Sequence, residues 1–169
     1  MKKALSILLS LILVLAAFPF SAIESFATDY YTSSDGEWMY YLNENNEAII
    51  YSGSTNSSAY LGSDTDVTVP SYIDSYPVVS IGQNTFSGNT NLQSIVLPNT
   101  LTTISNHVFY NCTNLTSITF GNSVGIIGPH AFDGCTNLVN ISIPSTVQTI
   151  GEYAFNNCKK ITSISFRTA

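Results

Sequence analysis

Hydrophobic residues recur along most of this chain at a fixed interval of 23 positions. One aromatic column and one cysteine column keep this step: Phe86, Phe109, Phe132 and Phe155, and Cys112, Cys135 and Cys158. Three aliphatic columns keep it as well: Leu92, Leu115, Leu138 and Ile161; Ile95, Ile118, Ile141 and Ile164; and Ile81, Ile104, Ile127 and Ile150. This pattern predicts coils that stack on one another, since a single coil cannot bury its own apolar side.

The order of apolar and polar positions inside each repeat predicts two strands. The first falls at 92–97, 115–120, 138–143 and 161–166, where positions one, four and six are apolar. A second, weaker ladder is expected at 101–104, 124–127 and 147–150, and a helical turn at 152–156 and its equivalents. A period of 20 to 29 residues with this spacing is typical of a leucine-rich repeat solenoid. We therefore expect a β-rich fold, with short parallel strands on one face and turns, short helical segments and the second ladder on the other.

The segments before the repeats differ from them. Residues 1–27 combine Lys2 and Lys3, an apolar run at 4–18, and Ser25-Phe26-Ala27, which is the pattern of a cleaved secretory signal peptide. Residues 28–66 contain the run 38–51, which predicts a β-hairpin, and we interpret this region as an N-terminal cap. Residues 67–169 then form the solenoid, with about four repeats at 67–95, 96–118, 119–141 and 142–164.

Charge is scarce and unevenly distributed. Hydrophobic residues make up 44% of the 169, charged residues only 9%, and the net charge is −6. An acidic chain without clustered bases is a poor partner for nucleic acid. Beyond the signal segment the only bases are Lys159, Lys160 and Arg167. They would discourage edge pairing or would meet the acidic cap of a second molecule head to tail.

The repeat unit resembles a known family. The runs IPSTVQTIGEYAFNNC at 143–158 and PHAFDGCTNL at 129–138 are similar to the BspA-type leucine-rich repeat, found in bacterial and protist surface proteins. The resemblance covers about residues 67–166. It implies a secreted or cell-surface protein that acts in adhesion and in binding to a host or matrix, without catalytic residues.

Two surfaces are candidates for binding. The outward positions of the first strands form a flat, neutral, hydroxyl-rich face suited to a protein or glycan; they are Ser94, Val96, Ser117, Thr119, Asn140, Ser142, Ser163 and Ser165. The alternative is a small carbohydrate-binding module that uses Trp38 and Tyr40 of the aromatic cap. Cap packing and cross-strand tyrosine pairs explain the same aromatic residues without a ligand. A third interpretation is a truncated piece of a longer surface protein.

Residues suited to catalysis or metal binding are few. The three cysteines form one inward column, which favours buried free thiols over disulfides. His107 and His130 share a column with Asn84 and Tyr153, and two ligands alone make a weak metal site. Asp64 and Asp66 lack the further oxygen ligands that calcium needs. We expect no enzyme activity, cofactor, metal or stable membrane anchor after cleavage, and a partner that is an extracellular or host protein or glycan.

Overall fold

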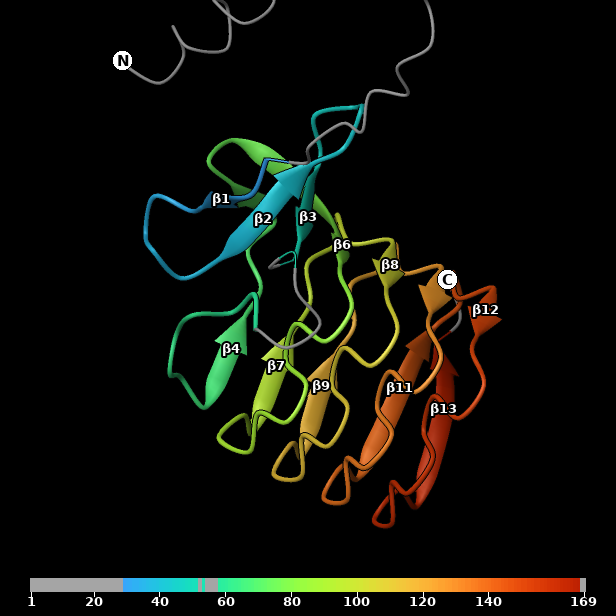
Figure 1. The fold of residues 1–169 in the computed structure, drawn as a ribbon. Coiled ribbons are helices and arrows are strands. Elements are labelled where there is room, and N and C mark those ends of the chain that lie inside the picture. The colour runs from blue at the N-terminus through green and yellow to red at the C-terminus, as the bar shows by residue number, and fades with distance from the viewer. Residues whose placement is uncertain (1–28, 52, 54–57, 168–169) are drawn as a thin grey trace, which may run out of the picture.

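The computed structural model describes residues 29–51, 53 and 58–167, so the expected signal peptide at 1–27 lies outside the described residues. The described chain winds into stacked coils (Figure 1). Over this part of the chain the regular elements are strands, joined by turns, and no helix has the length and hydrophobicity of a membrane span.

Five parallel strands lie side by side along one face of the coils (Figure 1), and we call them the first ladder. They are β4 (Asp66–Thr68), β7 (Ser94–Val96), β9 (Ser117–Thr119), β11 (Asn140–Pro144) and β13 (Ser163–Arg167). Strand β7 pairs in parallel with β4 and β9, and β11 pairs in parallel with β13. The register pairs Ile95 with Ile118 and Ile141 with Ile164, so equivalent residues of successive coils stack. The predicted ladder is confirmed.

A second parallel ladder runs along the other side of the coils. It consists of β6 (Tyr76–Ile81), β8 (Thr103–Ile104), β10 (Ile126–Ile127) and β12 (Thr149–Ile150). Ile81, Ile104 and Ile127 stand in register along it and are buried. The weak apolar column seen in the sequence is therefore a real ladder, and its strands are short because only two residues per coil keep the extended conformation.

The phenylalanine column runs between the two ladders. Phe86, Phe109 and Phe132 are fully buried, and successive ring centroids from Phe86 to Phe155 lie 5.3, 4.9 and 5.2 Å apart. The ring planes differ by only 6 to 15°, so the rings stack with parallel faces. Because each ring fills the space between its neighbours, every coil depends on the next for its core.

The helical turns expected at 152–156 and its equivalents are a correction, because hydrogen-bonded turns occur there instead. Each coil contains two residues in the left-handed region. His107, His130 and Tyr153 have φ between 54° and 57°, and Asn111 and Asn157 both have φ of 55°. A right-handed helix needs negative φ at every residue. Two left-handed residues four positions apart therefore bend the chain around the corner of the coil and prevent a helix.

The predicted hairpin is confirmed, and it extends the second ladder. Strands β2 (Met39–Leu42) and β3 (Ala48–Ile50) pair antiparallel, with the short β1 (Tyr31–Thr32) on the outer side of β2. Strand β3 pairs in parallel with β6, which joins the hairpin to the first coil. The insertion expected in the first repeat is strand β5 (Tyr72–Ile73), which turns back on β6.

Aromatic rings of the cap cover the first end of the phenylalanine column. Tyr60 lies 5.4 Å from Phe86, and Trp38 lies 4.8 Å from Tyr60 and 6.2 Å from Phe86, measured between ring centroids. Trp38 also pairs with Tyr60 through an isolated antiparallel bridge. These two residues close the apolar core where no preceding coil could do so.

Candidate functional site

The outward side chains of the first ladder form a continuous face, which we call the strand face. The structure brings all eight predicted residues onto it: Ser94, Val96, Ser117, Thr119, Asn140, Ser142, Ser163 and Ser165. Seven of them are exposed and Ser94 is half-buried, whereas the alternating Ile95, Ile118 and Ile141 point into the core. The alternation of a strand thus separates a small, polar outer surface from an aliphatic inner one.

The strand face is longer than the sequence suggested, because β4 adds to it. Asp66 pairs with Ser94 and Thr68 with Val96, which places one carboxylate at the end of an otherwise neutral surface. Ser94 Oγ donates a hydrogen bond to Asp66 Oδ1. The signal was available in the sequence, since the run Val67-Thr-Val-Pro70 matches the pattern at 95–98.

Hydrogen bonds use some of the hydroxyl groups on this face and leave others for a ligand. At one end Ser163 Oγ donates to Asn140 Oδ1 at 2.8 Å. At the centre, no hydrogen bond joins the hydroxyls of Ser117 and Thr119 to another described residue. The middle of the strand face therefore presents donors and acceptors that water satisfies in the unbound protein.

A groove of about 470 Å³ lies where the strands of the first ladder end. Thr68, Val96 and Thr119 of the strand face line it, and further lining residues include Pro98 and Phe120. Arg167 is the one charged residue among those that line the groove. The groove is thus continuous with the predicted binding face, and it adds a cation to a surface that the sequence had indicated to be neutral.

The guanidinium of Arg167 is held by the backbone two coils away. Its Nη2 donates to the carbonyl oxygen of Phe120 at 2.8 Å, and its Nε is buried without a hydrogen-bond partner among the described residues. Of the three bases near the end of the chain, Lys159 and Lys160 remain exposed, whereas Arg167 is half-buried. Sequence spacing could not show this contact, because it crosses from one repeat to another.

The aromatic residues of the cap are arranged differently from the carbohydrate platform that the sequence suggested. Trp38 and Tyr40 are only 2% and 3% exposed, so neither ring offers a face to a ligand. Tyr40 donates from its hydroxyl to Asp74 Oδ2 at 2.9 Å, and burial and this bond raise its pKa. The pKa of Asp74 is lowered, mainly by its hydrogen bonds from Ser34.

Three other tyrosines of the cap lie nearer the surface. Tyr30, Tyr41 and Tyr51 form an edge-to-face cluster with ring centroids 6.0 to 6.5 Å apart. Tyr30 is 43% exposed, and Tyr41 and Tyr51 are half-buried. Burial, and then the neighbouring Tyr30 and Tyr51, raise the pKa of Tyr41. The surface aromatic residues of the cap are therefore this group.

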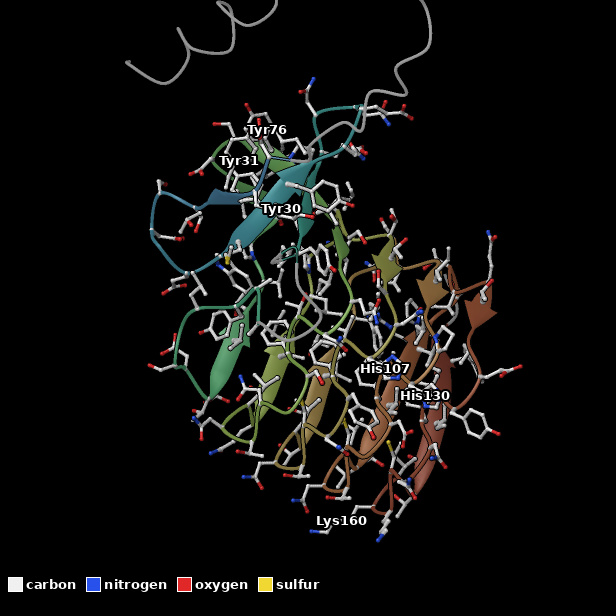
Figure 2. All side chains as sticks on the ribbon, in the orientation of Figure 1. Tyr30, Tyr31, Tyr76, His107, His130 and Lys160 are labelled. Carbon is white, nitrogen blue, oxygen red and sulfur yellow. The ribbon has the colours of Figure 1, made fainter. Side chains whose placement is uncertain are left out.

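The two histidines stack in the outer turns of neighbouring coils (Figure 2). Their ring centroids are 4.8 Å apart with planes 11° from parallel, and Tyr153 stacks on the other face of His130 at 5.1 Å. Stacked rings direct their nitrogen atoms sideways, not toward a common point. Among the described residues no three histidine, cysteine or acidic side chains gather as a metal site would require.

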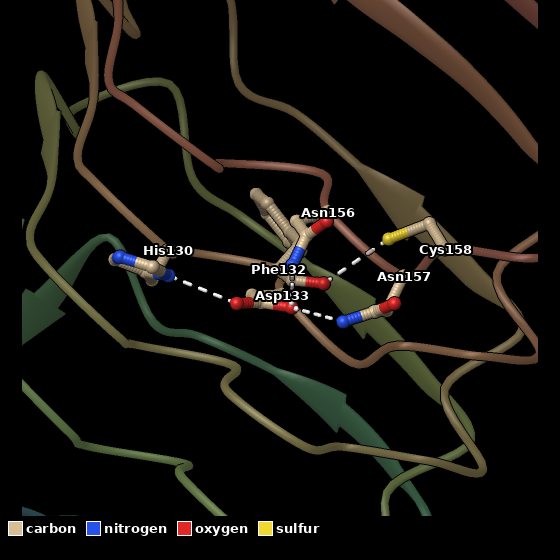
Figure 3. Close-up of polar contacts among 6 residues, drawn as sticks. All are labelled: His130, Phe132, Asp133, Asn156, Asn157 and Cys158. Carbon is tan, nitrogen blue, oxygen red and sulfur yellow. Dashed lines mark hydrogen bonds and ion pairs between the residues drawn. The ribbon is translucent and has the colours of Figure 1, made fainter.

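A buried carboxylate beside this stack links two coils (Figure 3). Asp133 is 6% exposed, and its Oδ2 lies 2.9 Å from Nδ1 of His130. Its Oδ1 accepts hydrogen bonds from the side-chain amides of Asn156 and Asn157 at 3.0 and 3.2 Å. Because a buried carboxylate is costly without such partners, the cluster has a structural explanation that needs no ligand.

The cysteines are free thiols, as the sequence predicted. Cys112 and Cys135 are buried, and Cys158 is half-buried. Each Sγ donates to the carbonyl oxygen of a phenylalanine in the preceding coil: Cys112 to Phe86, Cys135 to Phe109 and Cys158 to Phe132, at 3.0 to 3.1 Å. Burial raises the pKa of Cys112 to about 12 and of Cys158 to about 11, so their thiols are protonated and weakly reactive at neutral pH.

Solved structures of bacterial leucine-rich repeat proteins resemble this fold. The T. pallidum leucine rich repeat protein is 28% identical, with a TM-score of 0.55, over 75% of this chain and 67% of its own. A leucine rich cell surface protein from Faecalibacterium prausnitzii is 26% identical, with a TM-score of 0.61, over 82% of this chain and 43% of its own. A Bacteroides capillosus leucine-rich repeat protein shares the fold at 20% identity and a TM-score of 0.67, over 79% of this chain and 96% of its own. This chain thus corresponds to less than half of the Faecalibacterium protein.

No curated protein matches the chain. The family profile described as the BspA type leucine rich repeat region (6 copies) matches residues 60–169, which are 110 of the 169 residues. This span contains both ladders and the phenylalanine, cysteine and histidine columns. The chain therefore belongs to the BspA-type leucine-rich repeat family.

Proposed function

We propose that the chain is a secreted, non-catalytic adhesion module that binds an extracellular protein through the strand face. The observation that carries this proposal is the groove of about 470 Å³ that continues from the strand face and contains Arg167. A flat sheet with unpaired hydroxyls and an adjoining groove offers both contact area and a point of recognition. The cell-surface description of the Faecalibacterium relative supports a similar location for this chain.

The chemistry of the groove favours an acidic residue on the partner. The guanidinium of Arg167 uses one donor on Phe120 and has a buried Nε without an acceptor. An unsatisfied buried donor costs about 1–3 kcal/mol, and a carboxylate that draws the guanidinium slightly outward would supply the missing acceptor. Proline and aromatic carbons of Pro98 and Phe120 would pack against the stem of the partner's side chain.

The absence of catalysis is part of the proposal. The thiols of Cys112 and Cys135 are buried, so they are not available as nucleophiles. The buried carboxylate of Asp133 is occupied by hydrogen bonds from the next coil. The strand face itself supplies hydroxyls without an adjacent base, which is an arrangement suited to hydrogen bonding and not to bond cleavage.

Binding of the purified protein to immobilised matrix glycoproteins and polysaccharides tests the proposal, with two matched variants. Thr119→Lys places a long charged side chain at the centre of the strand face, and Thr149→Lys makes the same change on the exposed side of β12 in the second ladder. We expect Thr119→Lys and Arg167→Gln each to weaken binding by about tenfold or more, equivalent to at least about 1.4 kcal/mol. Thr149→Lys should leave the affinity unchanged. Equal effects of the two lysine variants would refute the strand face as the binding surface, and preferential binding to polysaccharide would replace protein by glycan as the partner.

Secretion needs its own test, because it depends on the first 27 residues. The protein expressed with its complete N-terminus should accumulate in the culture medium and should begin at Thr28. N-terminal sequencing of the secreted form checks this expectation. A protein that stays in the cytoplasm with residues 1–27 intact would contradict it.

A further inference from the structure

A second cavity lies on the opposite side from the strand face, where the cap hairpin meets the first coils. It measures about 320 Å³ and is lined on one side by Tyr41 and Tyr51 of the cap and on the other by Gln83, Ser105 and Asn106 of the coils. We call it the tyrosine pocket. Its volume is near the lower end of the range for small-molecule sites, and its position beside the second ladder separates it from the groove at Arg167.

The aromatic wall of the tyrosine pocket is held in place by its neighbours. The rings of Tyr41 and Tyr51 lie 6.5 Å apart at 75°, and Tyr30 packs edge to face on both. Gly82 lies beneath Tyr51, where an added Cβ would come within 2.8 Å of Tyr51 Cβ and 2.9 Å of the Ile50 carbonyl oxygen. The absence of a side chain at Gly82 therefore allows the Tyr51 side chain to lie directly against the first coil.

The polar wall of the pocket departs from the repeat. Ser105 occupies a column in which the other coils have Gly82, Gly128 and Gly151, so a hydroxyl is added at the pocket. Gln83 and Asn106 are exposed, and no hydrogen bond joins their side-chain amides to another described residue. Each amide offers both a donor and an acceptor, and none of the residues that line the pocket is charged.

We infer that the tyrosine pocket binds a neutral saccharide of one or two rings. A sugar ring has an apolar face of C–H groups, which packs against an aromatic ring, and a rim of hydroxyls, each of which donates and accepts hydrogen bonds. The pocket supplies the matching surfaces: rings from Tyr41 and Tyr51, and neutral amide and hydroxyl groups from Gln83, Ser105 and Asn106. A charged ligand would find no counter-ion there. This site is distinct from the proposed protein-binding surface, and it uses different residues from the buried Trp38 and Tyr40.

NMR titration of the full chain with maltose, cellobiose, lactose and xylobiose tests the inference. At least one disaccharide should produce saturable shifts with a dissociation constant of about 1 mM or tighter. Tyr41→Ala and Asn106→Ala should each weaken this binding by about tenfold or more. The matched controls are Tyr72→Ala, which removes a tyrosine that is 60% exposed and outside the pocket, and Asn45→Ala in the exposed hairpin turn.

Each outcome decides for or against the pocket. Asn106→Ala keeps the inference testable if Tyr41→Ala fails to fold, since the Asn106 side chain is exposed and joined to no other described residue. The absence of saturation by all four disaccharides at about 10 mM, or full affinity in Asn106→Ala, would overturn the inference. Equal losses in Tyr72→Ala and Tyr41→Ala would also overturn it. Thr119→Lys should not change saccharide affinity, so failure of this site and failure of the strand face are distinguishable.

Discussion

Replacing Phe109 with alanine is the sharpest test of the stacked core. Its ring is fully buried between Phe86 at 5.3 Å and Phe132 at 4.9 Å, with planes within 15° of parallel on both sides. Truncation of a buried phenylalanine costs about 3–5 kcal/mol. Because the ring is sandwiched on both faces and the coils on either side hold the backbone apart, the cavity cannot collapse easily, and we expect the upper half of this range.

Phe155 provides the matched comparison within the same column. It stacks on Phe132 alone, at 5.2 Å, and is half-buried. With one ring neighbour in place of two, Phe155→Ala should cost about half as much, roughly 1.5–2.5 kcal/mol. Phe109→Leu adds a further control, since it retains most of the volume and removes the ring stack. Its cost should be below about 1.5 kcal/mol if filling the space is the main contribution.

Urea unfolding can follow both ends of the molecule at once. Trp38, the one tryptophan of the chain, is buried against Tyr60 and Phe86, so its fluorescence reports on the cap. Far-ultraviolet circular dichroism reports on the strands. Coincident transitions would allow a single free energy of unfolding for each variant. A cost below about 1 kcal/mol for Phe109→Ala, or equal costs for Phe109→Ala and Phe155→Ala, would refute the stacked core.

Further predictions concern single groups. The pKa of Asp74 is lower in the folded protein, so its contribution to stability should be lost as pH falls below the ordinary carboxyl range; urea unfolding from pH 6 to pH 3 should show wild type approaching Asp74→Asn. Asp133→Asn should destabilise by about 1–3 kcal/mol, measured by the same unfolding, because it puts an amide donor beside two others. Three thiols should react after denaturation without reductant, and in the native protein the half-buried Cys158 should react first, with a rate that rises toward pH 11. Head-to-tail association through Lys159 and Lys160 stays a prediction; a monomer by sedimentation at low salt and high concentration would contradict it.

The repeat made most of the fold predictable. A column that recurs every 23 residues specifies which side chains stack, so both ladders, the phenylalanine column and the inward cysteines followed directly from the sequence. The expected helical turn at 152–156 was wrong because the left-handed conformation at Tyr153 and Asn157 is not visible in the residue types alone. Asparagine tolerates that conformation well, but histidine and tyrosine give no such warning.

Outside the repeat, sequence patterns were less informative. The hairpin was predictable from its alternation, but alternation does not say which face packs on the first coil. Trp38 and Tyr40 proved to be on the inner face, and Tyr41, on the opposite face of the same strand, lines the surface pocket. The contact from Arg167 to Phe120 spans 47 residues and depends on side-chain reach across an intervening coil, which no local pattern encodes.

The constant register of the coils also limits how such a chain can change in length. Thiol-to-carbonyl bonds join residues 26 apart, and strand pairs of the second ladder join residues 23 apart, all along the molecule. An insertion of one residue within a coil would displace every later partner, whereas a duplicated block of 23 would offer each displaced group an equivalent neighbour. Duplication and loss of whole coils are therefore the mutations that this architecture tolerates, and binding surfaces on the strand face would lengthen or shorten by one strand at a time.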